Sequence, residues 1–488
     1  MKKILYSAFA ASLLFASCEF NEGDNDNQDA FYEVPPETLL TNAEKQLADI
    51  VSTPSVNLNP MRYFDHYWAQ TTYNTESRFS FASRLVTDNF WNELFRDVLG
   101  NLQSSKEYIE TQEAPDEIDP AAWEIQRTNK LAIIDILQVY AFQVLVDTYG
   151  DIPYTEALNP QDKLPAYDND SDIYPQLIER LNADIAAFDD SQPSFATGEY
   201  IYEGDIASWI KFANSLKLKL GLNLSDVNPA LAQSTIESAV TGGVIQANSE
   251  NAAFRYPASA PNYSALYNEL VASGRIDFVA DGVFLTALEE KEDPRLNVYF
   301  APNGDGDFVG GVLGALNTPT SEFAQIGDVL KEPDLPAQLI EATEISFYLA
   351  EAAARGFSVG NSDEFYYNQA ITQSFEFWGV SGADTYLART DVAYATADGD
   401  FKQKIGMQMW YAFFNRPSEA WNSYRRLDYP QLEAPSNAST AADGEIPKRL
   451  YYPINEQTVN TDNYQAAVEA IGGIDRMRIH VFWDVVTD

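Results

Sequence analysis

Residues 121–149 are predicted to form one long helix, and its second half limits the types of fold open to the chain. That half, 131–149, has the sequence LAIIDILQVYAFQVLVDTY, which places apolar side chains on almost every face of a helix. A helix that is apolar all round must be covered on all sides by other elements. Gly150 supplies a helix stop, and Pro153 prevents the helix from resuming. The chain must therefore provide several further helices that pack around this one.

Other segments with helical periodicity can supply that cover. Residues 340–356 and 363–379 are expected to form a closely packed pair, because Gly356 ends the first helix and alanines 350 and 352–354 give it a surface of small side chains. Such a pair is typical of tetratricopeptide-like hairpins, although no 34-residue period holds along the chain. Further helices are expected over 38–50, 88–110, 172–189, 205–224, 228–242, 400–415 and 463–472.

The remaining segments are less periodic. Residues 53–87, 244–339 and 426–462 are richer in Gly, Pro, Asn and Ser, which predicts loops, short strands and small helices. The length of the chain allows one large domain or two or three smaller ones. We expect a mostly α-helical fold in one globular domain, 35–488, with a loop-rich, irregular half packed on a helical scaffold.

The N-terminal residues have the order of a secretory signal. Lys2 and Lys3 precede an apolar stretch, 4–15, and the small residues Ala16 and Ser17 precede Cys18, the only cysteine of the chain. Residues 14–18 (LFASC) resemble a bacterial lipobox, which predicts a signal peptide over 1–17 and a lipid on Cys18. The alternative is an ordinary cleaved signal with a thiol nearby.

A polar tether is expected to follow the lipidated cysteine. Residues 19–29 (EFNEGDNDNQD) cannot bury a core, so 18–34 is interpreted as a lipidated, acidic tether. The acidic run also resembles the surface-export signal of Bacteroidetes lipoproteins, and a plain spacer is the alternative. Several acyl chains on one cysteine would hold the protein firmly on a membrane.

The composition argues against several classes of function. With 31 Lys and Arg against 73 Asp and Glu, the net charge of −42 repels nucleic acid and other anionic partners. A single cysteine excludes an internal disulfide, and two histidines, His66 and His480, offer little for nucleophile activation or a metal site. Residues 303–307 (NGDGD) resemble part of a calcium loop but lack its final glutamate, so a tight turn is the preferred interpretation. We expect no cofactor, no metal and no enzymatic activity.

Several segments form recognisable motifs: 149–157 (YGDIPYTEA), 209–222 (WIKFANSLKLKLGL), 239–244 (AVTGGV), 293–295 (DPR), 408–427 (QMWYAFFNRPSEAWNSYRRL) with Pro430, and 446–453 (IPKRLYYP) with Asn460, Asn463 and Tyr464. They resemble motifs of SusD/RagB-type outer-membrane lipoproteins, and they occur in the family's order over nearly the whole mature chain. The subgroup of shorter SusD-like proteins is the most similar. Before its final aspartate the family often has a double tryptophan, where this chain has Phe482-Trp483-Asp484.

The resemblance implies a SusD-like fold with tetratricopeptide-like helix pairs. It also implies a lipid-anchored protein on the cell surface that binds glycans, or in some systems peptides. Such proteins pass their ligand to a SusC-like TonB-dependent outer-membrane transporter. The alternatives are a helical-repeat scaffold, or a peptide-binding component of an uptake complex. A glycosidase is a further alternative, since it needs only two carboxylates, but no motif singles out a pair.

Glycan capture requires exposed aromatic rings beside polar side chains. The densest such cluster is 61–79 (MRYFDHYWAQTTYNTESRF), between the first two long helices, a region that contributes ligand contacts in several family members. Any one of its aromatic residues can instead belong to the core. A second candidate is the loop around Tyr263, with Tyr256, Asn262 and Tyr267. The predicted ligand-binding residues are Trp68, Tyr73, Tyr63, Asn74, Arg78 and Tyr263.

The arginines of the 408–427 motif are assigned differently. Arg425 and Arg426 follow Trp421 and Tyr424, so we expect them to form an internal network of ion pairs and ring contacts. The alternative is a surface that contacts the transporter.

Overall fold

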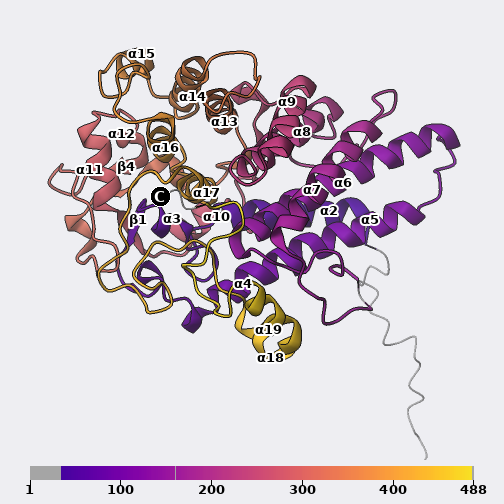
Figure 1. Ribbon diagram of the computed structural model, residues 1–488, viewed down its shortest axis with the longest axis horizontal. Helices are drawn as coiled ribbons and strands as arrows, with labels where there is room; N and C mark the ends of the chain where they lie inside the picture. The colour runs from indigo at the N-terminus through magenta and orange to yellow at the C-terminus, as the bar shows by residue number, and fades with distance from the viewer. Residues whose placement is uncertain (1–33, 160, 486–488) are drawn as a thin grey trace, which may run out of the picture. The chain divides into compact units, whose positions relative to one another are not determined.

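The computed structural model describes residues 34–159 and 161–485, and within the chain Pro36–Asp488 forms one compact unit. The predicted signal peptide, Cys18 and the tether as far as residue 33 lie outside the described residues. Most of the regular structure is helical, which confirms the mostly α fold (Figure 1).

The long helices follow the predicted ranges closely, except over 417–427, where no separate helix was expected. They are α2 (Pro36–Ser52), α5 (Gly100–Thr111), α6 (Pro120–Tyr149), α7 (Asp170–Ala187), α8 (Ile206–Asn223), α9 (Pro229–Gly242), α13 (Ala342–Ala354), α14 (Asp363–Phe377), α16 (Phe401–Ala412), α17 (Pro417–Leu427) and α19 (Thr461–Ala470). The helix expected over 88–110 is one continuous rod with a wider turn in its middle: α4 (Val86–Asn92), the π-helical η4 (Glu93–Leu99) and α5.

Shorter elements fill the loop-rich half. The short helices are α3 (Met61–Phe64), η2 (Glu76–Arg78), η3 (Ala82–Arg84), η5 (Asn248–Glu250), α10 (Ala265–Tyr267), η6 (Asn268–Ala272), α11 (Gly282–Glu290), α12 (Leu296–Tyr299), η7 (Thr320–Glu322), η8 (Asp328–Lys331), α15 (Ala383–Leu387) and α18 (Ile454–Val459). The strands are β1 (Trp68–Gln70), β2 (Ala252–Phe254), β3 (Phe278–Ala280), β4 (Phe300–Ala301), β5 (Gln325–Ile326) and β6 (Ala337–Ile340).

Helix α6 lies at the centre of the helical part. The side chain of Asp119 caps its first turn by accepting from the N–H groups of Ala121 and Ala122, and Pro120 occupies the first helical position. Gly150 ends it with a φ of +79°, which favours glycine. By length and composition α6 could cross a membrane, but 89% of its most apolar window is buried within the protein. It is therefore a core helix, as its sequence predicts.

The helices pack as neighbouring pairs: α2 with α5, α6 with α7, α8 with α9, and α13 with α14. Close approach within a pair requires small residues. In α8, a Cβ on Gly221 would lie 2.8 Å from a side-chain carbon of Ile236 in α9. In α13, Ala350 and Ala352 are fully buried, as the small-residue surface predicts. These pairs agree with the tetratricopeptide-like arrangement.

Three antiparallel strand pairs fasten the loop-rich half: β1 with β3, β2 with β6, and β4 with β5. In the first pair Trp68 lies opposite Ala280 and Gln70 opposite Phe278. The residues that follow β1 and the residues that precede β3 therefore emerge at the same edge. This pairing brings together segments that are about 200 residues apart in the sequence, and it positions the candidate site.

Candidate ligand-binding face

Four loop segments, 71–85, 271–277, 309–320 and 433–443, meet beyond the β1–β3 pair, and we call their shared surface the four-loop face. The backbone N–H of Thr71 donates to the carbonyl of Asp277 at 3.0 Å, which joins the first two segments. The buried amide of Asn317 donates to the carbonyl of Gln70 at 2.7 Å, which joins the third segment to the end of β1.

Side-chain amides hold the tips of these loops. Asn74 and Asn437 both donate to the carbonyl of Gly314, at 2.6 and 2.9 Å. Arg78 donates through Nε to the carbonyl of Asn437, and the hydroxyl of Ser439 donates to the carbonyl of Phe79. The face is therefore held by individual hydrogen bonds between side chains and backbone rather than by a continuous sheet.

Apolar side chains are exposed on this face, together with one half-exposed aromatic ring. Tyr73 is 54% exposed, although its neighbours Phe79 and Phe81 are buried. An aromatic ring surrounded by aliphatic side chains is suited to contact with the apolar faces of a ligand. The exposed apolar side chains on the four-loop face are Tyr73, Leu85, Val271, Ile276, Val309, Val312 and Leu316.

Two arginines flank the Tyr73 ring. The guanidinium carbons of Arg84 and Arg275 lie 5.5 and 6.0 Å from the ring centroid, within the range of cation–π attraction. Each arginine is also fixed by an acid: Arg84 by the fully buried Glu76, and Arg275 by Asp277, both at 2.8 Å. The hydrogen bond to Asp277 raises the pKa of Arg275. The ring is thus held in a defined place at the surface.

The structure separates the predicted ligand-binding residues into two groups. Tyr73, Asn74 and Arg78 lie on the four-loop face, where hydrogen bonds and ring contacts position them. Trp68 and Tyr63 are buried, with exposed fractions of 1% and 2%. Because β1 pairs with β3, the Trp68 ring packs on Phe278 at 5.3 Å and under the guanidinium of Arg62 at 4.7 Å. This burial corrects the expectation that Trp68 and Tyr63 present surfaces to a ligand.

Tyr263 lies in a separate loop. Its ring packs on Tyr267 at 4.7 Å between centroids, whereas Tyr256 is buried and donates to Asp49. Local sequence patterns did not single out Arg84, Arg275 or Asn437, which also belong to the face. The signal available for Arg84 was its place at the end of the aromatic-rich segment 53–87.

The larger hollows lie elsewhere. One of about 500 Å³ is lined by parts of 201–211 and 249–255, one of about 550 Å³ lies between α5, α6 and α7, and one of about 600 Å³ lies between α14 and α15. We place the candidate site at the four-loop face because an exposed aromatic ring beside the polar side chains of Asn74 and Arg78 is the chemistry that the sequence predicts. An open face of this kind suits an extended chain rather than an enclosed small molecule.

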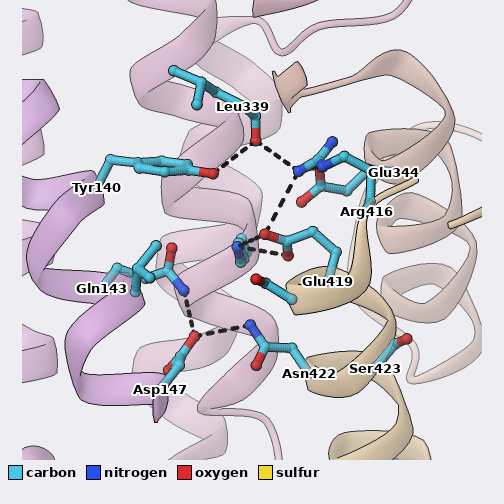
Figure 2. Close-up of polar contacts among 12 residues, drawn as sticks. Tyr140, Gln143, Asp147, Leu339, Glu344, Arg416, Glu419, Asn422 and Ser423 are labelled. Carbon is cyan, nitrogen blue, oxygen red and sulfur yellow. Dashed lines mark hydrogen bonds and ion pairs between the residues drawn. The ribbon is translucent and has the colours of Figure 1, made fainter. Parts of the chain in front are cut away.

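A cluster of paired, charged side chains lies in the interior of the protein. Lys219 of α8 pairs with Glu419 of α17 at 2.7 Å, and Arg416 pairs with Glu344 at 2.9 Å, all with side chains at most 8% exposed. Figure 2 shows Arg416 also reaching the carbonyl of Leu339, to which Tyr140 of α6 donates. Because substrate cannot reach these acids, they join helices in the core rather than perform chemistry.

The same network continues toward the C-terminus. Asp147 of α6 accepts from Gln143 and Asn422 (Figure 2) and from the indole of Trp483. Arg425 is fully buried, 3.7 Å from the centroid of Trp421. Arg426 holds Glu351 with a 2.9 Å ion pair. The expectation of an internal network of ion pairs and ring contacts at these arginines is confirmed.

The 303–307 segment forms the tight turn that its sequence favours. The Asn303 side-chain oxygen accepts from the N–H groups of Asp305 and Asp307, and Gly306 has a φ of +90°. Across 34–159 and 161–485, His, Cys, Asp and Glu form no group of three or more that could hold a metal ion.

Comparison with known proteins identifies the family. A family model named SusD-like_2, described as starch-binding and associating with the outer membrane, matches residues 27–453. A search of curated proteins found no match.

Solved structures share the fold over nearly the whole chain. A chitin-binding protein aligns with a TM-score of 0.78 at 25% identity, covering 92% of this chain and 100% of its own. A SusD homologue from Bacteroides uniformis aligns at 0.75 and 26% identity, with 92% and 99% covered. A chitin-binding SusD homologue from Flavobacterium johnsoniae aligns at 0.76 and 23% identity, also with 92% and 99% covered. The chain belongs to the SusD-like family.

Proposed function

We propose that this protein is a glycan-binding lipoprotein of the outer membrane that holds an oligo- or polysaccharide against the four-loop face. The family description supports an association with starch and the outer membrane, and the similar structure at 25% identity is a chitin-binding protein. The observation that carries the location is the exposed Tyr73 ring, held between Arg84 and Arg275.

The face has the chemistry that sugar recognition needs. The ring of Tyr73 and the aliphatic side chains of Ile276 and Leu316 can cover the apolar faces of sugar rings. Hydroxyl groups require polar partners at the edge, which Arg78 and the exposed Asn437 provide. Because the ring of Tyr73 is exposed at the surface, successive sugar units can lie across it.

Binding rather than hydrolysis is the proposed activity. A glycosidase places two carboxyl groups on either side of the scissile bond, one of them protonated. On this face Glu76 and Asp277 are each engaged by an arginine that lies beside the ring, and Glu76 is fully buried. Neither is positioned to protonate a leaving group.

The anchoring and delivery steps follow from the family resemblance. Lipid on Cys18 would keep the protein at the cell surface, and a SusC-like TonB-dependent transporter would receive the glycan. Affinity purification of the full-length protein from its own outer membrane tests this step. A transporter of that class should co-purify, and its absence from a preparation that retains the lipidated protein would contradict the proposal.

The binding proposal is tested with a soluble form that begins at Glu19 and so lacks Cys18. It is screened against a panel of starch-, chitin- and plant-derived glycans by affinity electrophoresis and calorimetry. If a sugar covers about 60 Å² of the ring, burial at about 25 cal/mol per Å² contributes about 1.5 kcal/mol. Tyr73→Ala should therefore weaken binding about tenfold.

Tyr200 is a matched control, because its ring is 50% exposed and belongs to a different part of the protein. Tyr200→Ala should leave glycan affinity unchanged. Equal effects of the two substitutions would refute the four-loop face as the site. Failure of the folded wild-type protein to bind any glycan would refute the function itself.

A further inference from the structure

A second surface has the properties of a ligand site. It is the hollow of about 600 Å³ between α14, α15 and the 246–248 loop, and both helices are labelled at the top of Figure 1. Its floor is fixed by Gln373 of α14, whose Nε2 donates to the carbonyl of Gln246 at 2.6 Å. Asn248 in turn donates to the carbonyl of Gln373 at 3.0 Å. The loop and the helix therefore form one continuous wall.

The hollow is lined by amide groups that have no partner. Within the described part of the chain, the side chains of Gln246, Asn368 and Gln369 make no hydrogen bond, and the buried Oδ1 of Asn248 accepts none. A buried acceptor without a partner costs about 1–3 kcal/mol. The side chains of Gln246, Asn368 and Gln369 are exposed or partly exposed, so a ligand or water can complete their hydrogen bonds.

The polar groups of the other hollows are largely engaged. Between α5, α6 and α7, Arg180 binds Asp135 and Gln176 donates to the carbonyl of Asp172. In the hollow beside residues 249–255, Lys211 pairs with Glu250. The α14–α15 hollow differs from these two because three of its lining amide side chains, those of Gln246, Asn368 and Gln369, are not used in internal hydrogen bonds among the described residues.

The lining selects the class of ligand. Phe365 is 50% exposed and supplies an aromatic ring, and Leu387 adds apolar surface. No Lys or Arg is among the described residues that line the hollow, whereas Glu376 and Asp384 are acidic, so an anionic ligand would be repelled. Amide groups both donate and accept, which matches hydroxyl groups.

We propose that the hollow between α14 and α15 is a second glycan-binding site, which takes a neutral saccharide segment. Phe365 covers one face of a sugar ring, and Gln369, Asn368 and Gln246 bind its hydroxyl groups. The choice of a glycan as occupant rests on the proposed function. Two sites on one protein hold a polysaccharide by avidity, so a long chain binds much more tightly than a short one.

The test uses the soluble protein from Glu19, with maltohexaose and chitohexaose as short probes and soluble starch as the polymer. Calorimetry should give two molecules of the short probe per protein. The double variant Phe365→Ala/Gln369→Ala should reduce this to one, whereas Tyr73→Ala should weaken one of the two sites about tenfold and leave the other unchanged. Each change should also weaken binding of the polymer at least about tenfold, because avidity needs both sites. Unchanged melting temperatures verify folding, as expected because Phe365 and Tyr73 are exposed.

The outcomes distinguish this inference from the function on which it rests. One molecule of probe per wild-type protein, bound about tenfold more weakly by Tyr73→Ala and unchanged in Phe365→Ala/Gln369→Ala, overturns the second site and leaves the four-loop face intact. Binding of peptides but not glycans, lost in the Phe365→Ala/Gln369→Ala variant, overturns the assignment of the occupant. An absence of any glycan binding overturns both proposals.

Discussion

The turn Asp293-Pro294-Arg295 gives the most direct test of how the interior is held together. Both charged side chains are completely buried. Arg295 donates through Nη2 to Asp293 at 2.6 Å, through Nε at 3.0 Å, and through Nη1 to Ser374 at 2.8 Å. Its guanidinium lies 4.9 Å from the ring of Phe375. Burial by itself lowers the pKa of Arg295, but the charge and hydrogen bonds of Asp293, together with the nearby Tyr299 and Tyr386, outweigh burial and raise the pKa.

Arg295→Met removes the cation and leaves the carboxylate of Asp293 buried without a countercharge. Breaking a buried pair on one side costs about 3–5 kcal/mol. Unfolding entropy of about 2.1 cal/mol/K per residue gives about 1 kcal/mol/K for a unit of about 450 residues. The substitution should therefore lower the melting temperature by about 3–5 °C, measured by differential scanning calorimetry.

The double variant Asp293→Asn/Arg295→Met provides the control. The amide side chain introduced by Asp293→Asn would keep an oxygen to accept the backbone N–H of residue 295, a 3.0 Å bond that shapes the turn, while removing the unpaired charge. The double variant should recover more than half of the loss. A single variant as stable as the wild type, or a double variant less stable than the sum of its parts, would refute the reasoning.

Two further predictions concern the loops. His66 is buried between Asp281 and the carbonyl of Glu433. Burial lowers its pKa, but the hydrogen bond and charge of Asp281 outweigh this and raise it. The ion pair of His66 with Asp281 thus stabilises the fold below about pH 6.5, and this stabilisation is lost as the pH rises through the pKa of the folded state. His66→Asn should therefore have a lower free energy of unfolding in urea than the wild type, and this difference should shrink between about pH 6 and 8. A difference that grows over that range would contradict this sign. At Gly204 (φ +81°) a Cβ would lie 2.1 Å from the carbonyl of Phe195, whereas at Gly444 (φ +83°) it would meet open space. Gly204→Ala should therefore lower the free energy of unfolding by at least about 1 kcal/mol more than Gly444→Ala does. Equal losses would show that the loop at Gly204 relaxes freely.

The helical scaffold could be predicted from the sequence because its signal is local. Apolar periodicity, the alanines of 350–354 and the stop at Gly150 each act within a few turns, and α6 and α13 begin and end within two residues of the predicted positions. The π-helical turn of η4 could not be predicted in this way, since nothing in its composition differs from that of an α-helix.

The candidate site was only partly predictable, because exposure depends on distant pairing. Trp68 and Tyr73 belong to the same aromatic, amide-rich segment, so composition predicts both equally as ligand-binding residues. The difference between them comes from strand β3, about 200 residues later. It pairs with β1 and covers Trp68, but it does not extend as far as Tyr73. Arg275 belongs to the candidate site for the same reason, because the β1–β3 pairing brings the segment before β3 to the same edge as Tyr73. No local sequence pattern predicts this.

The division between scaffold and loops also bears on which glycan is bound. Relatives at about 25% identity keep the fold, and in this chain the scaffold is secured by buried groups such as Arg295, Arg425 and Lys219. The four-loop face is secured by a few amide–carbonyl hydrogen bonds, which leave the side chains of Tyr73 and Arg275 outside the core. If the four-loop face is the binding site as proposed, substitution on it should change the recognised sugar without disturbing the internal ion pairs. On that proposal the specificity of a relative does not transfer with its fold, and the residues around Tyr73 would decide which glycan this protein binds.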